Sequence, residues 1–266
     1  MTIPAALRGA RRGTGTATHA PPAWLVGTGV LVALLGLVPI GYLAVVALGS
    51  GEALSLVLRD RTLMVLVNSV ALATTVTVAS LMVGVPIAWL TTRSDLPGRR
   101  VWAVLAVLPL VVPSYVGGYA IVAAFGPRGA LQSLLEPLGV ERLPEIYGFL
   151  GAALTLTLFS YPYVVLSVRG ALLRLDPAFE EVSRALGRGP WHTFLTVTLP
   201  QLRPAMTAGG LLVALYCLSD FGAVSLLQFD SFTRAIYVQY RASFDPALAA
   251  VLSLMLVACT AGILLA

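Results

Sequence analysis

The sequence predicts an all-α protein that crosses a membrane several times. Of its 266 residues, 58% are hydrophobic and only 11% are charged, and the mean hydropathy is +0.90. Soluble domains normally carry about a quarter charged residues, so water is not the main solvent of this chain. A segment in lipid must satisfy its backbone hydrogen bonds internally, and a long apolar run does so as a helix.

Six apolar stretches reach the roughly 20 residues that a spanning helix needs. None contains a basic residue, and they cover residues 23–48, 63–92, 101–125, 147–168, 205–228 and 246–266. The first is longer than the apolar core of a secretory signal and lacks a small-x-small cleavage site, so we expect an uncleaved span. We therefore predict a disordered cytoplasmic tail over 1–22 and a six-helix transmembrane domain over 23–266.

The arginines predict a cytoplasmic N-terminus, because cytoplasmic loops of membrane proteins hold the positive excess. In that orientation eleven of the 17 basic residues, all arginine, lie inside, and six lie outside with seven of the twelve acids. The inner set is Arg8, Arg11, Arg12, Arg93, Arg99, Arg100, Arg169, Arg174, Arg184, Arg188 and Arg203. The outer set is Arg59, Arg61, Arg128, Arg142, Arg234 and Arg241.

The composition excludes several chemistries. Lysine is absent, which removes both a phosphate-loop lysine and a lysine Schiff base. The arginines are spread through short segments between spans and form no basic face, so we expect no nucleic-acid partner. The only histidines are His19 and His192, and Cys217 and Cys259 both lie in apolar runs. We therefore expect no metal site, no cofactor and no catalytic residues.

The end of the chain predicts a longer protein. The last span reaches Ala266 without a polar flank to hold it at the interface, and the six-span pattern has no second copy within these residues. We expect that a second copy, if there is one, follows on the same chain or forms a separate subunit.

The longest cytoplasmic connection, residues 169–203, is predicted to be structured. Asp176 and Pro177 are typical of a helix start, because the carboxylate can accept free backbone N–H groups and proline suits the first turn. Glu180 and Glu181 follow in that turn, where negative charge favours the helix dipole. Gly187 can take the left-handed conformation that ends a helix.

A second short helix is predicted after Gly189 and Pro190. Trp191, Phe194 and Leu195 give it an apolar face, and we expect Leu199, Pro200 and Pro204 to break it before the fifth span. Apolar side chains on the wet side of a membrane need a partner. The alternative to a protein partner is an interfacial helix that lies on the lipid headgroups.

The same loop resembles a known motif. Glu181-Val-Ser-Arg-Ala-Leu-Gly187, followed by Val197-Thr-Leu199-Pro200, is similar to the EAA loop of binding-protein-dependent ABC importer permeases. Val182 and Ser183 stand where the family has two alanines, and Val197 replaces isoleucine.

The resemblance implies a permease of the bacterial inner membrane with the type I ABC importer fold. ATP would be hydrolysed by a separate cytoplasmic ATPase dimer that binds this loop, and an external solute-binding protein would deliver the solute. The residues it assigns to ATPase coupling are Glu181, Ser183, Gly187, Trp191, Phe194, Leu199 and Pro200.

Three further segments resemble ferric-iron importer permeases, which usually contain two six-helix halves. The segments are Pro109 to Tyr119, Ser219 to Val224 and Thr233 to Asp245. This chain matches the length of the first half. Thiamine and aminophosphonate permeases share much of the pattern, so the resemblance leaves the solute open.

Two of these segments supply the candidate translocation pathway. Prolines and glycines weaken the backbone hydrogen bonding of the third span. Membranes tolerate the freed backbone groups only where protein or a wet cavity satisfies them. Close helix packing through small residues explains the glycines equally well. A carboxylate in a span normally faces the bundle interior, a wet cavity or a partner. Asp220 is therefore expected either to line the pathway or set its gate, or to lie near the outer interface or hydrogen-bond a neighbouring helix terminus. The candidates are Pro113, Ser114, Tyr115, Gly117, Gly118, Asp220, Phe221 and Gly222.

Three rival functions remain open from the residues alone. An ion-coupled secondary transporter would use Asp220 as its ion site and the broken third span as its binding element. An intramembrane hydrolase would use Ser219 and Asp220, although no histidine lies within a span to act as the base. A purely structural membrane protein is the third.

Overall fold

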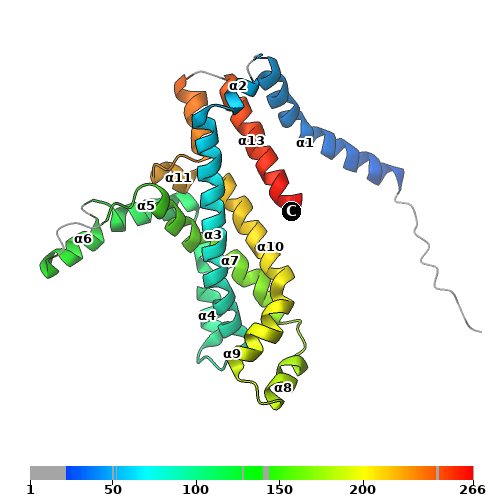
Figure 1. Ribbon diagram of the computed structural model, residues 1–266, viewed down its shortest axis with the longest axis vertical. Helices are drawn as coiled ribbons and strands as arrows, with labels where there is room; N and C mark the ends of the chain where they lie inside the picture. The colour runs from blue at the N-terminus through cyan, green and yellow to red at the C-terminus, as the bar shows by residue number, and fades with distance from the viewer. Residues whose placement is uncertain are drawn as a thin grey trace, which may run out of the picture. The chain divides into compact units, whose positions relative to one another are not determined.

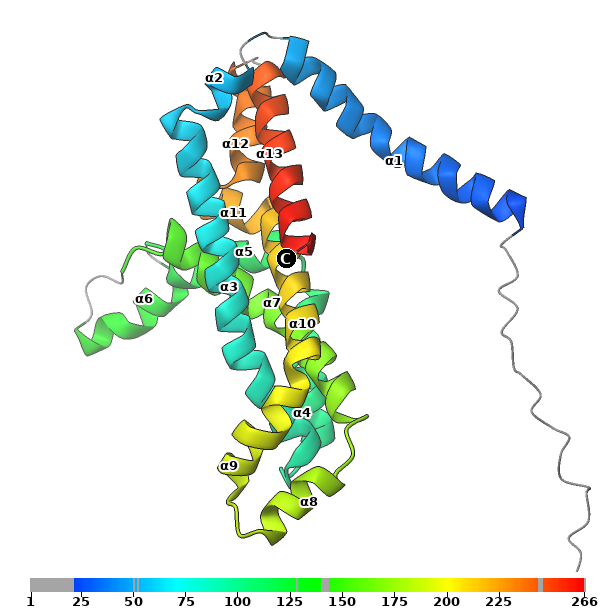
Figure 2. The same ribbon diagram turned by 45° about the vertical axis from the view of Figure 1, so that its right-hand side comes forward.

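The computed structural model describes residues 22–49, 51, 53–127, 129–139, 144–243 and 246–265, and all regular elements within them are helical. Figures 1 and 2 show the helices from two sides. The all-α prediction is therefore confirmed. Of the predicted tail over 1–22, only Pro22 lies within the described residues. The chain divides into two units, residues 1–42 and 43–266, and the core belongs to the second.

The α-helices follow one another with short connections. The first seven are α1 (Ala23–Gly49), α2 (Ala53–Val57), α3 (Asp60–Arg93), α4 (Arg99–Leu105), α5 (Ser114–Phe125), α6 (Ala130–Leu135) and α7 (Phe149–Leu172). The others are α8 (Ala178–Ala185), α9 (Pro190–Thr193), α10 (Leu199–Ser219), α11 (Gly222–Leu226), α12 (Phe232–Val238) and α13 (Pro246–Leu265). Short 3₁₀ turns cover Leu108–Val111 and Glu136–Leu138, and π turns cover Phe194–Thr198 and Gln239–Ser243.

Five helical segments of the described chain are long and apolar enough to cross a membrane, and a bent pair makes up to six. The five are α1, α3, α7, α13 and the continuous segment Pro190–Ser219. The predicted polytopic fold is confirmed, and four of the six predicted spans lie within a few residues of the observed helices.

The third span differs from the prediction of one helix over 101–125. The segments Arg99–Val111 and Ser114–Leu138 meet at a bend of 97°. Val112 is extended, with φ −83° and ψ 120°, because the ring of Pro113 disfavours the helical region for the residue before it. Pro113 also has no N–H to continue the helical ladder. The span is therefore broken at Pro113.

The predicted fifth span over 205–228 has the wrong limits. Helix α10 begins at Leu199 and ends at Ser219, and Asp220 is extended with ψ 130°. A separate short helix, α11, then begins at Gly222. The break occurs at Asp220, whose side chain accepts hydrogen bonds from backbone N–H groups in the first turn of α11.

The core is a three-helix packing of α3, α7 and α10 (Figure 2). Val164 of α7 lies between two glycines, Gly84 of α3 and Gly209 of α10. A Cβ on Gly84 would lie 2.8 Å from the Val164 Cβ, and a Cβ on Gly209 would lie 3.1 Å from the Val164 Cα. Glycine at these two positions therefore lets all three backbones approach closely.

The two ends of the unit formed by residues 43–266 carry different elements. Helices α8 and α9 lie at one end with α4 and the end of α3, whereas α2, α12 and the start of α13 lie at the other (Figures 1 and 2). Helices α3 and α10 contact elements at both ends, and α7 packs against both of them.

Candidate functional site

Helix α8 begins and ends where the sequence predicts. The Asp176 Oδ1 accepts a hydrogen bond of 3.0 Å from the Ala178 backbone N–H. Glu180 and Glu181 lie in the first turn. Gly187 has φ +81°, in the left-handed region that favours glycine, and ends the helix. The predicted helix and its glycine stop are confirmed.

The predicted break at Leu199, Pro200 and Pro204 is wrong. Helix α9 continues through the π turn Phe194–Thr198 into α10, as one segment from Pro190 to Ser219. In the π turn the Leu199 N–H bonds to the Phe194 carbonyl, five residues back. This wider turn directly precedes Pro200 and accommodates a residue that cannot donate a hydrogen bond.

Buried hydroxyl groups join α8 to the segment that follows it. The Ser183 and Thr193 hydroxyl oxygens lie 2.9 Å apart, and both residues are buried. The Thr198 hydroxyl donates to the Glu180 Oε1 at 3.0 Å. Thr198 is only 2% exposed, so this bond lies inside the protein. Ser183, which was predicted to contact the ATPase, is thus used within the chain.

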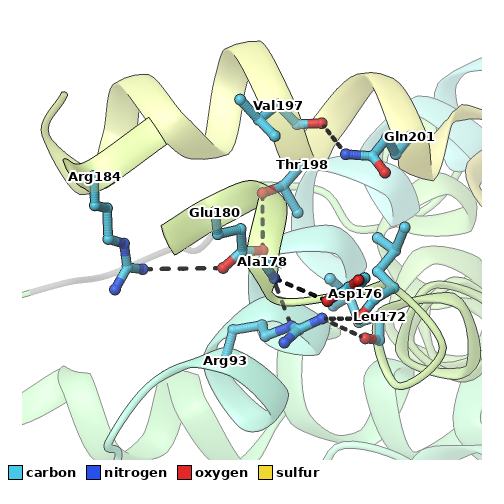
Figure 3. A network of polar contacts seen from close by, with 10 residues as sticks. Arg93, Leu172, Asp176, Ala178, Glu180, Arg184, Val197, Thr198 and Gln201 are labelled. Atoms are coloured by element: carbon cyan, nitrogen blue, oxygen red, sulfur yellow. Dashed lines mark hydrogen bonds and ion pairs between the residues drawn. The ribbon is translucent and has the colours of Figure 1, made fainter. Parts of the chain in front are cut away.

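Arg93, the last residue of α3, contacts the end of α7 and helix α8 (Figure 3). Its Nη2 donates to the backbone carbonyls of Leu172 and Leu175, each at 2.8 Å, where α7 ends. Its Nε lies 4.0 Å from the Glu180 Oε1. The other Glu180 oxygen lies 4.0 Å from Arg184, whose side chain is half exposed.

An aromatic contact one helical turn before Arg93 reaches α9. The rings of Trp89 and Trp191 are stacked with centroids 6.0 Å apart, and the Phe194 ring lies 5.3 Å from that of Trp89. Phe194 is only 8% exposed, whereas Trp191 is 69% exposed. Phe194 therefore packs inside the protein, and Trp191 has a free face.

The exposed side of α8 is apolar in a pattern that our sequence reasoning missed. Phe179, Val182 and Leu186 are 60%, 59% and 73% exposed. They are spaced by three and four residues, so they lie on one face of the helix. That spacing was readable in the sequence. We call these three residues with Trp191 the coupling face; beside it, Glu181 and Gly187 are also exposed.

The two remaining coupling candidates lie at the start of α10. Leu199 is half-buried and packs against the core, and Pro200 is exposed. Neither is one of the four residues that define the coupling face.

Asp220 has a structural task. Its carboxylate Oδ1 accepts hydrogen bonds from the backbone N–H groups of Ala223 at 2.9 Å and Val224 at 3.4 Å, and so caps α11. The Ser114 side chain is a further partner of this carboxylate. The Asp220 carbonyl accepts from the Thr233 hydroxyl at 2.6 Å. Asp220 is 7% exposed. It therefore joins α5, α11 and α12.

The glycines of the candidate pathway lie at close backbone contacts. A Cβ on Gly118 would lie 3.2 Å from the Ala223 Cα, and one on Gly222 would lie 2.9 Å from the Tyr115 Cβ. A Cβ on Gly117 would clash with the Phe159 ring. These three glycines allow α5 to pack against α7 and α11.

Exposed aromatic rings gather around the same break. Tyr115 lies beside Gly222, and the Phe221 and Tyr237 rings are 4.9 Å apart. Tyr115, Phe221 and Tyr237 are 59%, 40% and 48% exposed. Pro113 is exposed, and Ser114 is half-buried. The structure thus brings the predicted residues from the third and fifth spans together. Their role in a pathway stays a prediction.

The described residues include no group of three or more His, Cys, Asp or Glu side chains that could hold a metal ion. The loop can bind an apolar partner surface, and the aromatic group can line a surface between helices.

Residues 84–266 match the sequence profile of the family described as "Binding-protein-dependent transport system inner membrane component". Among curated proteins, the Fe(3+)-transport system permease protein FbpB 2 of Haemophilus influenzae is 34% identical over 243 residues, which are 90% of this chain and 44% of that protein. The chain thus spans less than half the length of this relative. The molybdenum transport system permease ModB of Mycobacterium tuberculosis is 35% identical over 75% of this chain and 76% of its own. The sulfate transport system permease CysT of Escherichia coli is 32% identical over 66% of this chain and 64% of its own.

Solved structures share the fold. A chain of the bacterial alginate ABC transporter, in complex with a periplasmic protein, superposes with a TM-score of 0.67 at 14% identity and covers 91% of this chain and 92% of its own. A chain of the MetNI methionine ABC transporter gives a TM-score of 0.59 at 16% identity, over 78% of this chain and 95% of its own. At these identities the likeness establishes the ABC transporter permease fold alone.

Proposed function

Because the chain belongs to the family of binding-protein-dependent transport system inner membrane components, we propose that it is one permease half of an ATP-driven importer. In this proposal an external binding protein delivers the solute and a separate cytoplasmic ATPase dimer drives the transport. The chain itself is a multi-pass component of the inner membrane and forms part of the pathway.

The coupling face carries this proposal. Phe179, Val182, Leu186 and Trp191 expose apolar side chains at one end of the helical unit, on a loop that internal hydrogen bonds hold in place. Burying such a face in a partner releases roughly 25 cal/mol per Å² of apolar area. The partner that we propose is the groove of the ATPase, with Glu181 positioned to pair with a basic residue at its edge.

The orientation follows from this partner. The ATPase is cytoplasmic in this proposal, so α8 and α9 face the cytoplasm. The arginine count separately predicts a cytoplasmic N-terminus. The arginine bias supports this orientation, because α3 ends at Arg93 and α4 begins with Arg99 and Arg100. The end of α3 and helix α4 lie at the same end as α8 (Figure 1).

The pathway that we propose runs along the exposed rings of Tyr115, Phe221 and Tyr237, beside the broken third span. It passes between this permease half and a second one. Tyr115, Phe221 and Tyr237 leave their rings exposed on one side of the close contact between α5 and α11. The second half lies on the same longer chain or in a second subunit. The rival ion-coupled mechanism depends on Asp220, whose Oδ1 is engaged in capping α11.

Ferric iron is the solute that we propose. The ferric-iron permease of Haemophilus influenzae aligns over 90% of this chain, and the molybdenum and sulfate permeases align over smaller shares. The test is uptake of radiolabelled ferric iron, molybdate and sulfate by native cells with and without the gene. Loss of iron uptake alone supports the proposal. Loss of molybdate or sulfate uptake instead would assign the permease to that anion.

The ATPase contact is tested with the full-length protein, tagged and purified from native membranes. We expect vanadate-sensitive ATP hydrolysis in the purified wild type and its loss in Val182→Asp, because a charge cannot be buried unpaired in an apolar groove. Leu138→Asp is the matched control, since Leu138 is 77% exposed and belongs to the 3₁₀ turn that directly follows α6. Helix α6 lies far from α8 in both views. Hydrolysis that survives in Val182→Asp would refute the coupling face.

A further inference from the structure

Two side chains at the cytoplasmic end of α3 hold the coupling loop. Trp89 and Arg93 are four residues apart, so they project from the same face of the helix. Trp89 stacks on Trp191 and contacts Phe194, and Arg93 pairs with Glu180. One face of α3 therefore touches α8, α9 and the π turn together.

From these contacts we propose that Trp89 and Arg93, with Glu180 and Thr198, form the joint that transmits movement of the coupling face to the membrane helices. This inference rests on the proposed function and names the residues through which it operates. They are positioning residues: the coupling face binds the ATPase, and the joint connects that face to the core.

The polar part of the joint connects four helical segments. The Arg93 Nη2 is bound to the carbonyls of Leu172 and Leu175 at the end of α7, and Glu180 of α8 accepts from Thr198 just before α10. Because α3, α7 and α10 form the core, a displacement of α8 acts on all three. Protein interiors are close-packed and transmit displacements rather than absorb them.

The burial of these groups makes the joint specific. The Arg93 and Glu180 side chains are 15% and 14% exposed, so each charge is largely removed from water. Leaving either without its partner is costly, because a buried charge cannot recover its hydration. The exposed pair of Glu180 with Arg184 is screened by solvent and contributes much less.

The distance between the Arg93 and Glu180 side chains can become shorter. Its Nε is buried and has no hydrogen-bond partner among the described residues, and it lies 4.0 Å from the Glu180 Oε1. A hydrogen bond between them needs about 2.9 Å, so a shift of α8 toward α3 by about 1 Å completes it. The joint can therefore adopt a looser and a tighter arrangement as the ATPase closes.

The experiment follows hydrogen exchange by mass spectrometry in the full-length protein, purified with its ATPase, with and without ATP plus vanadate. In the wild type we expect nucleotide to change exchange both at α8, residues 178–185, and at the opposite end of α3, residues 60–70. In Arg93→Gln and Thr198→Val we expect the change at α8 to remain and the change at residues 60–70 to be lost.

The matched controls are Thr198→Ser, which keeps the hydroxyl, and Arg100→Gln, which removes an exposed arginine at the same end of the protein. Both are expected to behave as the wild type. A wild-type change at residues 60–70 in Thr198→Val and Arg93→Gln would overturn the joint. Should Arg93→Gln fail to insert, the comparison of Thr198→Val with Thr198→Ser decides the question. A wild type without any nucleotide response at α8 would instead refute the proposed function.

Discussion

The Asp220 Oδ1 accepts a hydrogen bond of 2.9 Å from the backbone N–H of Ala223, three residues later, at the point where α10 ends and α11 begins. From the sequence this carboxylate had two interpretations, a pathway or gate role and a structural role at the outer interface or at a neighbouring helix terminus. It has backbone partners of its own chain, as capping residues do at helix starts.

Substitution of Asp220 separates its capping role from a pathway role. Asp220→Asn keeps an oxygen acceptor for the cap, and we expect the thermal unfolding of the purified protein and its transport to stay close to wild type. Asp220→Ala removes the acceptor and is expected to cost about 1 kcal/mol of stability. Transport lost in Asp220→Asn at wild-type stability would show that the charge itself serves the pathway.

Gly187 is expected to tolerate asparagine better than alanine or aspartate. At its φ of +81° a residue with a Cβ destabilises the protein by roughly 1 kcal/mol, and asparagine is among the residues that do so least. We expect Gly187→Asp to remain in the membrane and to lose vanadate-sensitive ATP hydrolysis, with Gly187→Asn retaining most of it. Full hydrolysis and full transport in Gly187→Asp would contradict the assignment of this loop to coupling.

Gly84 is expected to be a size-sensitive position of the core. A side chain there meets the Val164 Cβ at 2.8 Å and the Tyr161 carbonyl oxygen at 3.1 Å. We expect Gly84→Val to destabilise the protein by about 1–3 kcal/mol, as overpacked cores do, in thermal unfolding in detergent. Gly170→Val on α7 is the control, because no atom lies within 4 Å of a Cβ at that position. Equal melting temperatures of the two variants would contradict the close approach of α3 and α7.

The hydroxyl pair of Ser183 and Thr193 is expected to act as a unit. Ser183→Ala leaves the buried Thr193 hydroxyl without this partner, at a cost of about 1–3 kcal/mol. The double variant Ser183→Ala with Thr193→Val removes both polar groups. Its loss of stability is expected to be smaller than the sum of the two single losses. Additive losses would indicate that the two hydroxyls do not interact.

Most of the fold was predictable because membrane spans are coded locally. A run of about 20 apolar residues is sufficient to form a helix in lipid, whatever lies beside it. The helix start at Asp176 and its end at Gly187 were predictable for the same reason, since capping and left-handed turns involve neighbouring residues only.

The limits of the third and fifth spans were not predictable from apolar runs. Hydrophobicity carries no signal at Val112, where the following Pro113 redirects the chain, or at Asp220, whose carboxylate takes over backbone partners of α11. The continuous helix through Pro200 depends on a π turn, which the sequence pattern does not reveal.

The sequence by itself determined that this protein is a multi-span helical membrane protein with a structured loop of the EAA type, because hydrophobic length, capping residues and motif spacing are properties of consecutive residues. Only the tertiary structure decided which loop residues are available to a partner. Phe194 and Ser183 are buried by contacts with Trp89 and Thr193, whereas Phe179, Val182 and Leu186 stay exposed. Burial depends on segments distant in the chain that meet only after the helices have packed.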